Sequence, residues 1–145
     1  MRLTLPPPVL FLGCALAMWF VPPFYVFPRY WIMILLLWGA SAGIALMSLW
    51  QFMQANTTVS PFSPEKSTVL VTNGVYRISR NPMYLSLALL LLAWALWLGS
   101  LSAVIFFMLF ILLMTEMQIK REELALEKLF GETYVAYKQQ VRRWL

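Results

Sequence analysis

Long stretches without a charged residue constrain this chain more than any other feature. No Asp, Glu, Lys or Arg occurs in residues 3–28, 30–64 or 81–115. A helix needs about 20 apolar residues to cross the hydrocarbon core of a bilayer, and each stretch is at least that long. With 61% hydrophobic and only 12% charged residues, the composition excludes a soluble globular enzyme and a disordered tail. The sequence therefore predicts an integral membrane protein.

The charge-free stretches divide into four predicted transmembrane helices, at residues 9–27, 30–54, 82–98 and 101–118. Pro22 and Pro23 bend or end the first of them, and Gly99-Ser100 splits the last stretch into two helices. We expect an all-α polytopic helix bundle in one domain over residues 1–145, with C-terminal amphipathic helices on the cytoplasmic side. Both helices of the 82–118 hairpin are short for a bilayer, so whether the hairpin crosses it fully stays open.

The basic residues predict the orientation of this bundle. Four crossings place ten of the eleven Lys and Arg residues on one side, with Arg29 alone on the other. Cytoplasmic loops carry an excess of Lys and Arg, so we expect both termini in the cytoplasm and the chain in the inner cell membrane. The net charge of +5 then reflects orientation, and we predict no binding to nucleic acid.

Missing residue types exclude several kinds of chemistry. The chain has no His, its six acidic residues are all Glu, and Cys14 is the single cysteine. A His-based catalytic dyad, an Asp base, a His-ligated metal site and an internal disulfide are therefore excluded. We predict no metal site.

The first polar stretch with groups suited to binding a ligand, residues 70–84, leads directly into a predicted helix. Asn81 and Pro82 are typical of the N-cap and the first residue of a helix. Unpaired backbone N–H groups and the helix dipole favour an anion there, and Arg80 lies beside them. This pattern suits a carboxylate or phosphate. The alternative is an ordinary cap, with Arg77 and Arg80 serving only as anchors at the membrane surface.

The second polar stretch, residues 116–145, is predicted to leave the membrane as an amphipathic helix. At 100° per residue, one apolar sector contains Ile119, Leu126, Leu129 and Phe130. Glu122 falls inside this sector and Glu123 lies at its edge. A buried carboxylate is costly unless it is paired, so Glu122 needs a cation from Arg80 or from a ligand. The alternative is that both acids are solvated.

Gly131 is expected to break this helix. Tyr134, Tyr137, Val141 and Trp144 then recur on one helical face, which is typical of packing or of an interfacial aromatic anchor. Arg142 and Arg143 are suited to anionic lipid.

At these residues the sequence resembles the superfamily of isoprenylcysteine carboxyl methyltransferases and phospholipid methyltransferases. The shared elements are Gly-x-Tyr at residues 74–76, Arg-Asn-Pro-Met-Tyr at 80–84, and Glu-Glu followed by Leu126 and the Phe-Gly-x-x-Tyr-x-x-Tyr run at 122–137. The likeness covers roughly residues 70–142. Asn81 stands where the superfamily usually has His, and unlike His it cannot titrate near neutral pH.

The resemblance implies a methyltransferase that uses S-adenosyl-L-methionine and releases S-adenosyl-L-homocysteine. It implies a cofactor site at the cytoplasmic membrane edge, between elements 70–84 and 119–142. Carried over by position, the acidic pair lies near the amino acid end of the cofactor, and Arg80 near its carboxylate or near the polar head of the acceptor. Arg80 and Glu122 are the catalytic candidates. The cofactor-binding candidates are Gly74, Val75, Tyr76, Arg80, Asn81, Pro82, Tyr84, Glu122, Glu123 and Leu126.

The acceptor is expected to be a lipophilic or prenylated molecule that enters from the bilayer. A carboxylate arrives already anionic and needs no strong base, whereas an ammonium group must first lose a proton. The absence of His and Asp favours a carboxylate or thiol acceptor over an amine, and the resemblance implies carboxyl O-methylation of the isoprenylcysteine type. The alternatives are a phospholipid N-methyltransferase, a thiol S-methyltransferase and, from a different class, a non-enzymatic membrane scaffold.

Overall fold

The four predicted helices are all present. The computed structural model describes residues 5–55 and 69–145, and within these ranges regular structure consists of helices alone. The four are α1 (Pro7–Phe20), α2 (Trp31–Gln54), α3 (Pro82–Leu98) and α4 (Leu101–Met114). α1 ends before Pro22 and Pro23, seven residues earlier than predicted, because proline cannot continue a helix. The all-α prediction is confirmed.

Two helices are long and apolar enough to cross a membrane, namely α2 and the continuous helix Leu101–Phe130 that begins with α4. At 1.5 Å per residue, the 14 residues of α1 span about 21 Å and the 17 residues of α3 about 26 Å. Both lengths are below the about 30 Å of a hydrocarbon core. The crossing of four helices therefore stays a prediction. Arg2 and residues 56–68, which the predicted orientation also uses, lie outside the described residues.

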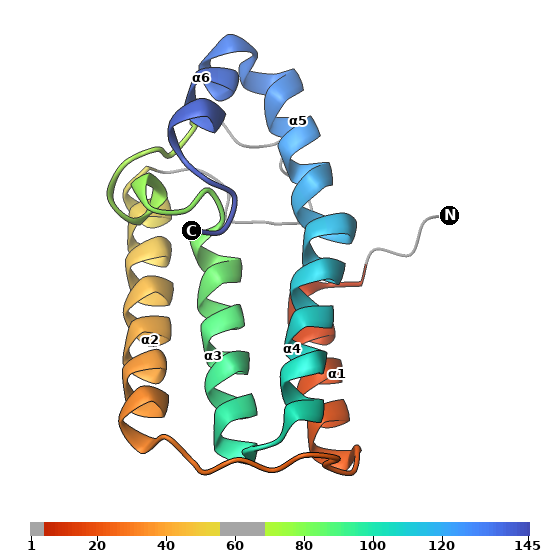
Figure 1. Cartoon of the computed structure of the whole chain (residues 1–145). Helices are drawn as coiled ribbons and strands as arrows, with labels where there is room; N and C mark the ends of the chain where they lie inside the picture. Colours follow the sequence, from red (N-terminus) through yellow and green to blue (C-terminus); the bar gives the residue numbers. More distant parts are fainter. Residues whose placement is uncertain (1–4, 56–68) are drawn as a thin grey trace.

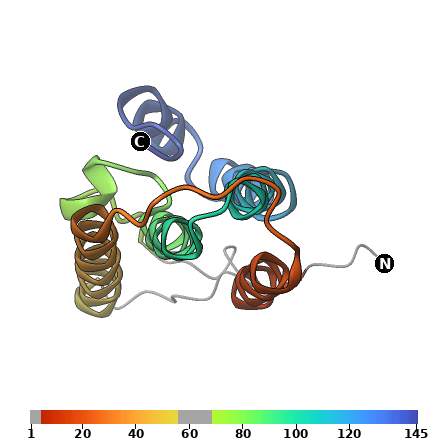
Figure 2. The ribbon, with the colours of Figure 1, turned by 60° about the horizontal axis from the view of Figure 1, so that its bottom comes forward.

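α3 lies at the centre of the bundle and packs against α1, α2 and α4, as Figures 1 and 2 show. The core between α1, α3 and α4 contains Leu91, Ala95, Ala103 and Phe110, all fully buried. At the foot of Figure 1, residues 21–30 run beneath the helices. There the Phe27 N–H donates to the Gly99 carbonyl at 2.9 Å, so this connection is hydrogen-bonded to the turn between α3 and α4.

The opposite end of the bundle carries the polar elements. α4 continues through the π-helical turn η3 (Thr115–Ile119) into α5 (Lys120–Phe130). Gly131, at φ +54°, ends α5, which confirms the predicted break, and α6 (Glu132–Gln140) follows. The short helix η2 (Gly74–Arg77) precedes α3. In Figure 1, α6 and the C-terminus fold back towards the start of α3, so the two polar stretches meet.

Candidate active site

The Arg-Asn-Pro corner before α3 and the acidic pair on α5 lie in direct contact. Arg80 Nη1 is 3.0 Å from Glu123 Oε1, and the Tyr84 hydroxyl donates a hydrogen bond to Glu122 Oε1. These groups come from segments about 40 residues apart in the chain. The long helix that begins with α4 runs antiparallel to α3, so α5 returns its acids to the end of the bundle where α3 begins.

Glu123 is the buried member of the acidic pair, with 6% of its surface exposed. Arg143 binds it through two hydrogen bonds, from Nε at 2.9 Å and from Nη2 at 2.7 Å, and Arg80 approaches from the other side. Burial by itself would raise the pKa of Glu123, but the Arg143 hydrogen bonds and the positive charge of Arg80 outweigh it and hold the pKa below its ordinary value. Glu123 is therefore an ionised structural anchor.

Glu122 has a different environment although it is the adjacent residue. It is half-buried, it accepts from the Tyr84 hydroxyl, and no cation pairs with it within residues 5–55 and 69–145. Burial raises the pKa of the Glu122 carboxyl to about 7; the Tyr84 hydrogen bond opposes this shift and the charge of Glu123 adds to it. Of the two expected sources of a cation for Glu122, Arg80 lies against Glu123 instead, which leaves a ligand. Glu122 remains accessible to a ligand.

The C-terminal segment is held on the corner by backbone carbonyls. Asn81 Nδ2 and Ser79 Oγ donate to the Arg143 carbonyl at 3.0 and 3.2 Å, and the Arg80 N–H donates to the Arg142 carbonyl at 3.0 Å. Asn81 and Pro82 are the N-cap and the first residue of α3, as predicted, but the Asn81 side chain makes no capping hydrogen bond. Asn81 instead fastens the segment that brings Arg143 to Glu123.

The Gly-x-Tyr element lies in an aromatic cluster beside the corner. Val75 and Tyr76 are buried together with Tyr134, Tyr137 and Val141. The Tyr137 hydroxyl donates to the Tyr76 carbonyl at 2.6 Å, and Leu126 packs against the same cluster. Tyr134 and Tyr137 of the predicted face therefore serve packing and tie α6 to η2, whereas Val141 and Trp144 lie beyond the end of α6 and Trp144 packs against the core of the bundle.

Tyr134 joins the aromatic cluster to the charged corner, because its side chain interacts with that of Arg80. Burial raises the pKa of Tyr134 to about 12, with the charge of Glu123 adding and Arg80 opposing. Tyr134 is thus a neutral polar neighbour of the ion pairs at physiological pH.

The structure sorts the residues predicted from the sequence into two groups. Arg80, Asn81, Tyr84, Glu122 and Glu123 form one polar cluster, with Pro82 buried as the first residue of α3. Val75, Tyr76 and Leu126 belong to the aromatic cluster, and Gly74 lies against Gln51 at the end of α2, at φ +57°.

Two further residues belong to this region and were not predicted. Arg143, which the sequence assigned to lipid, forms a bidentate ion pair with Glu123. Gln51 contacts Gly74, and its Oε1 is buried without a hydrogen-bond partner among the described residues. The signal for Gln51 was its position as one of two glutamines in the last turn of a largely apolar helix.

The unsatisfied groups of the polar cluster have opposite charge. Within the two described ranges, Arg80 Nε is buried and donates to no acceptor, while Glu122 has no cation. A ligand that carries both an ammonium and a carboxylate group matches this pair, because charge-assisted hydrogen bonds are the strongest available to each group. The amino acid end of S-adenosylmethionine has this chemistry, so the residues present fit the cofactor.

Comparison with known proteins gives a family match over most of the chain. A family model described as "Phospholipid methyltransferase" matches residues 28–133, a range that contains both polar segments up to the start of α6. A protein of Haemophilus influenzae, named only as an uncharacterized protein, is 57% identical over 63 residues, which are 43% of this chain and all of that protein. No solved structure matches.

Proposed function

This chain belongs to the phospholipid methyltransferase family, and we propose that it transfers the methyl group of S-adenosylmethionine to a lipophilic acceptor at the membrane edge where α3 begins. Family membership makes it a methyltransferase. The observation that carries the assignment of the site is one cluster in which, among the described residues, Arg80 Nε has no acceptor and Glu122, next to the partner of Arg80, has no cation.

Different residues of the cluster bind different groups of the cofactor. Glu122 accepts the ammonium group of the cofactor, and Arg80 donates to its carboxylate through the atoms that Glu123 leaves free. Glu123 and Arg143 hold Arg80 in position. The cofactor supplies an electrophilic methyl carbon on its sulfonium. Transfer requires alignment of two bound reactants, which contributes several kcal/mol, and requires no protein nucleophile.

For the acceptor, we propose first a carboxylate of the isoprenylcysteine type. Such a group arrives as an anion and needs no base, and Arg80 and Arg143 make the corner attractive to it. The second candidate is the amine of a phospholipid, which the half-buried position of Glu122 beside Tyr84 favours. Burial raises the pKa of the Glu122 carboxyl to about 7, so its carboxylate can accept a proton from an ammonium group near neutral pH.

Methyl transfer from labelled cofactor tests both candidates. We expect the full chain in vesicles to methylate either a prenylcysteine or phosphatidylethanolamine. Transfer to a small thiol without lipid would identify an S-methyltransferase instead. Absence of any cofactor binding by calorimetry would favour a non-enzymatic scaffold.

Glu122→Gln separates the two roles of that residue, because glutamine keeps the hydrogen bond from Tyr84 and loses the charge. If Glu122 binds the cofactor ammonium, the affinity for cofactor falls about tenfold; if it acts as a base, kcat falls at unchanged affinity. Glu116→Gln, an exposed acid on the preceding turn, is the matched control. Full activity in both Glu122→Gln and Arg80→Ala would remove these assignments.

We further propose four membrane crossings with both termini in the cytoplasm of the inner cell membrane. The support is the distribution of basic residues and the position of the polar elements at one end of the bundle (Figure 1). Reporter fusions at each terminus and after Tyr30 test this orientation. The two termini should report the same side, and the fusion after Tyr30 the opposite one.

A further inference from the structure

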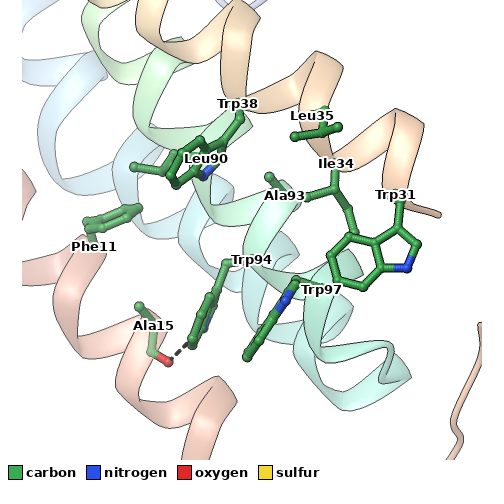
Figure 3. Close-up of a pocket in the computed structure, with 10 residues that line it drawn as sticks. All are labelled: Phe11, Ala15, Trp31, Ile34, Leu35, Trp38, Leu90, Ala93, Trp94 and Trp97. Atoms are coloured by element: carbon green, nitrogen blue, oxygen red, sulfur yellow. Dashed lines mark hydrogen bonds between the residues drawn. The ribbon is translucent and has the colours of Figure 1, made fainter. Parts of the chain in front are cut away.

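An apolar groove of about 540 Å³ lies between α1 and α2, with α3 as its floor. Ten residues line it, and Figure 3 shows that they come from all three helices, with Phe11 and Ala15 on the side of α1 and Trp31, Ile34, Leu35 and Trp38 on the side of α2. The volume is within the range of binding sites for small molecules. The lining is formed by apolar and aromatic side chains, so it suits a hydrocarbon.

The groove is separate from the candidate active site. It uses Leu90, Ala93, Trp94 and Trp97 of α3, whereas Tyr84 shares the other side of α3 with Ala88, Leu91 and Ala95 in the core. At 100° per residue, the mean directions of these two sets differ by roughly 140°. The groove also lies along the half of α3 that is farther from Arg80. A ligand in the groove therefore does not occupy the polar cluster.

The open side of the groove is rimmed by exposed aromatic residues. Trp31 and Trp38 expose more than half of their surface, as does Leu35. Towards the foot of the bundle, Trp19 of α1 stacks on Trp94 and Trp97. Tryptophan is enriched at membrane interfaces, so these rings place the foot of the bundle at headgroup level and the groove at the depth of lipid chains.

Arg29 lies at the same end, against the ring of a groove residue. Its guanidinium carbon is 5.3 Å from the centroid of Trp97, and its Nε donates to the Trp97 carbonyl at 2.7 Å. None of the five glutamates in the described ranges forms an ion pair with it. It is also the single basic residue between Arg2 and Lys66. The groove thus has a cation at headgroup level and apolar walls deeper in the membrane.

We propose that this groove binds one acyl chain of an anionic phospholipid whose phosphate pairs with Arg29. The proposal rests on the membrane placement given under the proposed function and is independent of methyl transfer. The occupant is a lipid of the leaflet opposite the active site. Charge complementarity at Arg29 favours an anionic headgroup, and the almost entirely apolar lining disfavours a headgroup inside the groove.

Native mass spectrometry of the full chain, released from bilayers of phosphatidylglycerol or phosphatidylcholine, tests this site. We expect one retained lipid per chain, with phosphatidylglycerol preferred about fivefold, the contribution of one basic residue near an anionic surface. Ala15→Trp fills the groove and should abolish retention. Leu16→Trp, on the exposed neighbouring position, should retain the lipid. Arg29→Gln should keep the lipid but lose the preference, and Arg29→Lys should restore it.

Circular dichroism and cofactor affinity, measured for every variant, separate this proposal from the proposed function. A wild-type chain that binds lipid but no cofactor would overturn the proposed function alone. Lipid retention by Ala15→Trp, or a headgroup preference unchanged in Arg29→Gln, would overturn the lipid site. Loss of methyl transfer in Ala15→Trp at unchanged cofactor affinity would assign the groove to the acceptor, and loss of a dimer would assign it to a second copy. If Ala15→Trp does not fold, the Arg29 pair decides.

Discussion

The two ends of the helix bundle are built on opposite principles. At the polar end, Glu123 is enclosed by Arg80 and Arg143, and hydrogen bonds to the C-terminal carbonyls complete the enclosure. At the other end, the groove between α1 and α2 leaves Trp31 and Trp38 uncovered. Buried charges must be paired inside the protein, whereas apolar walls can be covered by lipid. The ion pairs of Glu123 are therefore complete within the protein, whereas the groove would be completed by the proposed lipid.

The same contrast separates the two adjacent acids. Glu123 has its pKa lowered by cations, and Glu122 has its pKa raised by burial. Neighbouring positions on a helix point about 100° apart, so one side chain enters the ion pairs and the other meets Tyr84. A satisfied carboxylate holds structure, and an unsatisfied one is available to a ligand.

The largest effect is expected for Glu123→Gln, which leaves Arg80 and Arg143 without their shared anion. Removing one partner of a buried ion pair costs about 3 kcal/mol of unfolding free energy, and the C-terminal segment should detach. Chemical denaturation with circular dichroism measures the loss. Glu132→Gln, an exposed acid in the first turn of α6, is the control and should change stability by less than about 0.5 kcal/mol. Equal stability of the two variants would contradict the anchoring role.

At the foot of the bundle, Gly99→Ala should cost about 2 kcal/mol. Gly99 has φ +63°, and an added Cβ would lie 2.7 Å from the Phe27 carbonyl oxygen, so both backbone strain and a steric clash oppose it. Gly39→Ala is the matched control, because nothing lies within 4 Å of its Cβ position; alanine should be neutral or stabilising in that helix. Thermal unfolding in detergent distinguishes the two, and the cofactor affinity of both should stay near wild type.

A smaller loss is expected for Asn81→Ala, which removes the hydrogen bond to the Arg143 carbonyl. One such bond contributes about 1 kcal/mol. Asn81→His introduces the usual residue of the superfamily and keeps a donor at this position, so it should recover most of the lost stability. Denaturation curves and cofactor affinity of the two variants decide the matter. If the histidine variant were as unstable as the alanine variant, the hydrogen bond to the C-terminal segment would not be the role of this position.

The smallest effect concerns pH. Cofactor affinity should fall as pH decreases through about 7, because Glu122 becomes protonated and loses its attraction for an ammonium group. In the protein without cofactor, the contribution of Glu122 to the free energy of unfolding changes with pH in the opposite direction. The raised pKa means that the folded state binds a proton more tightly than the unfolded state, so the contribution of Glu122 is complete below its ordinary pKa and is lost as pH rises through about 7.

Tyr84→Phe sharpens this prediction. The Tyr84 hydroxyl lowers the pKa of Glu122, so its removal should move the midpoint of the affinity profile to higher pH, by less than about one unit for a single neutral hydrogen bond. Calorimetric titrations between pH 5.5 and 8.5 measure it (a range of roughly 1.5 units on each side of the midpoint). A midpoint that moves down, or a profile that Glu122→Gln leaves unchanged, would assign the titration to another group.

Local patterns in the sequence predicted the helices well. α2 and α3 begin and end within one residue of the predicted bounds, and Gly131 separates α5 from α6. Charge-free stretches, prolines and glycines act over a few residues, so their effect is visible without the fold. The end of α1 was predicted too late because Pro22 and Pro23 stop the helix rather than bend it.

Long-range pairing decided the rest. The amino acid sequence by itself determined the helices and the resemblance to membrane methyltransferases. It also determined a basic corner before one helix and two neighbouring acids on another. Only the tertiary structure decided that Glu123 pairs with both Arg80 and Arg143, so that Arg143 belongs to the site and not to the lipid surface. It also decided that α1 and α2 form the walls of a groove on α3. The physical reason is that ion pairing and packing depend on which side chains face each other across helices, and a chain pattern specifies a helix face but not its neighbour.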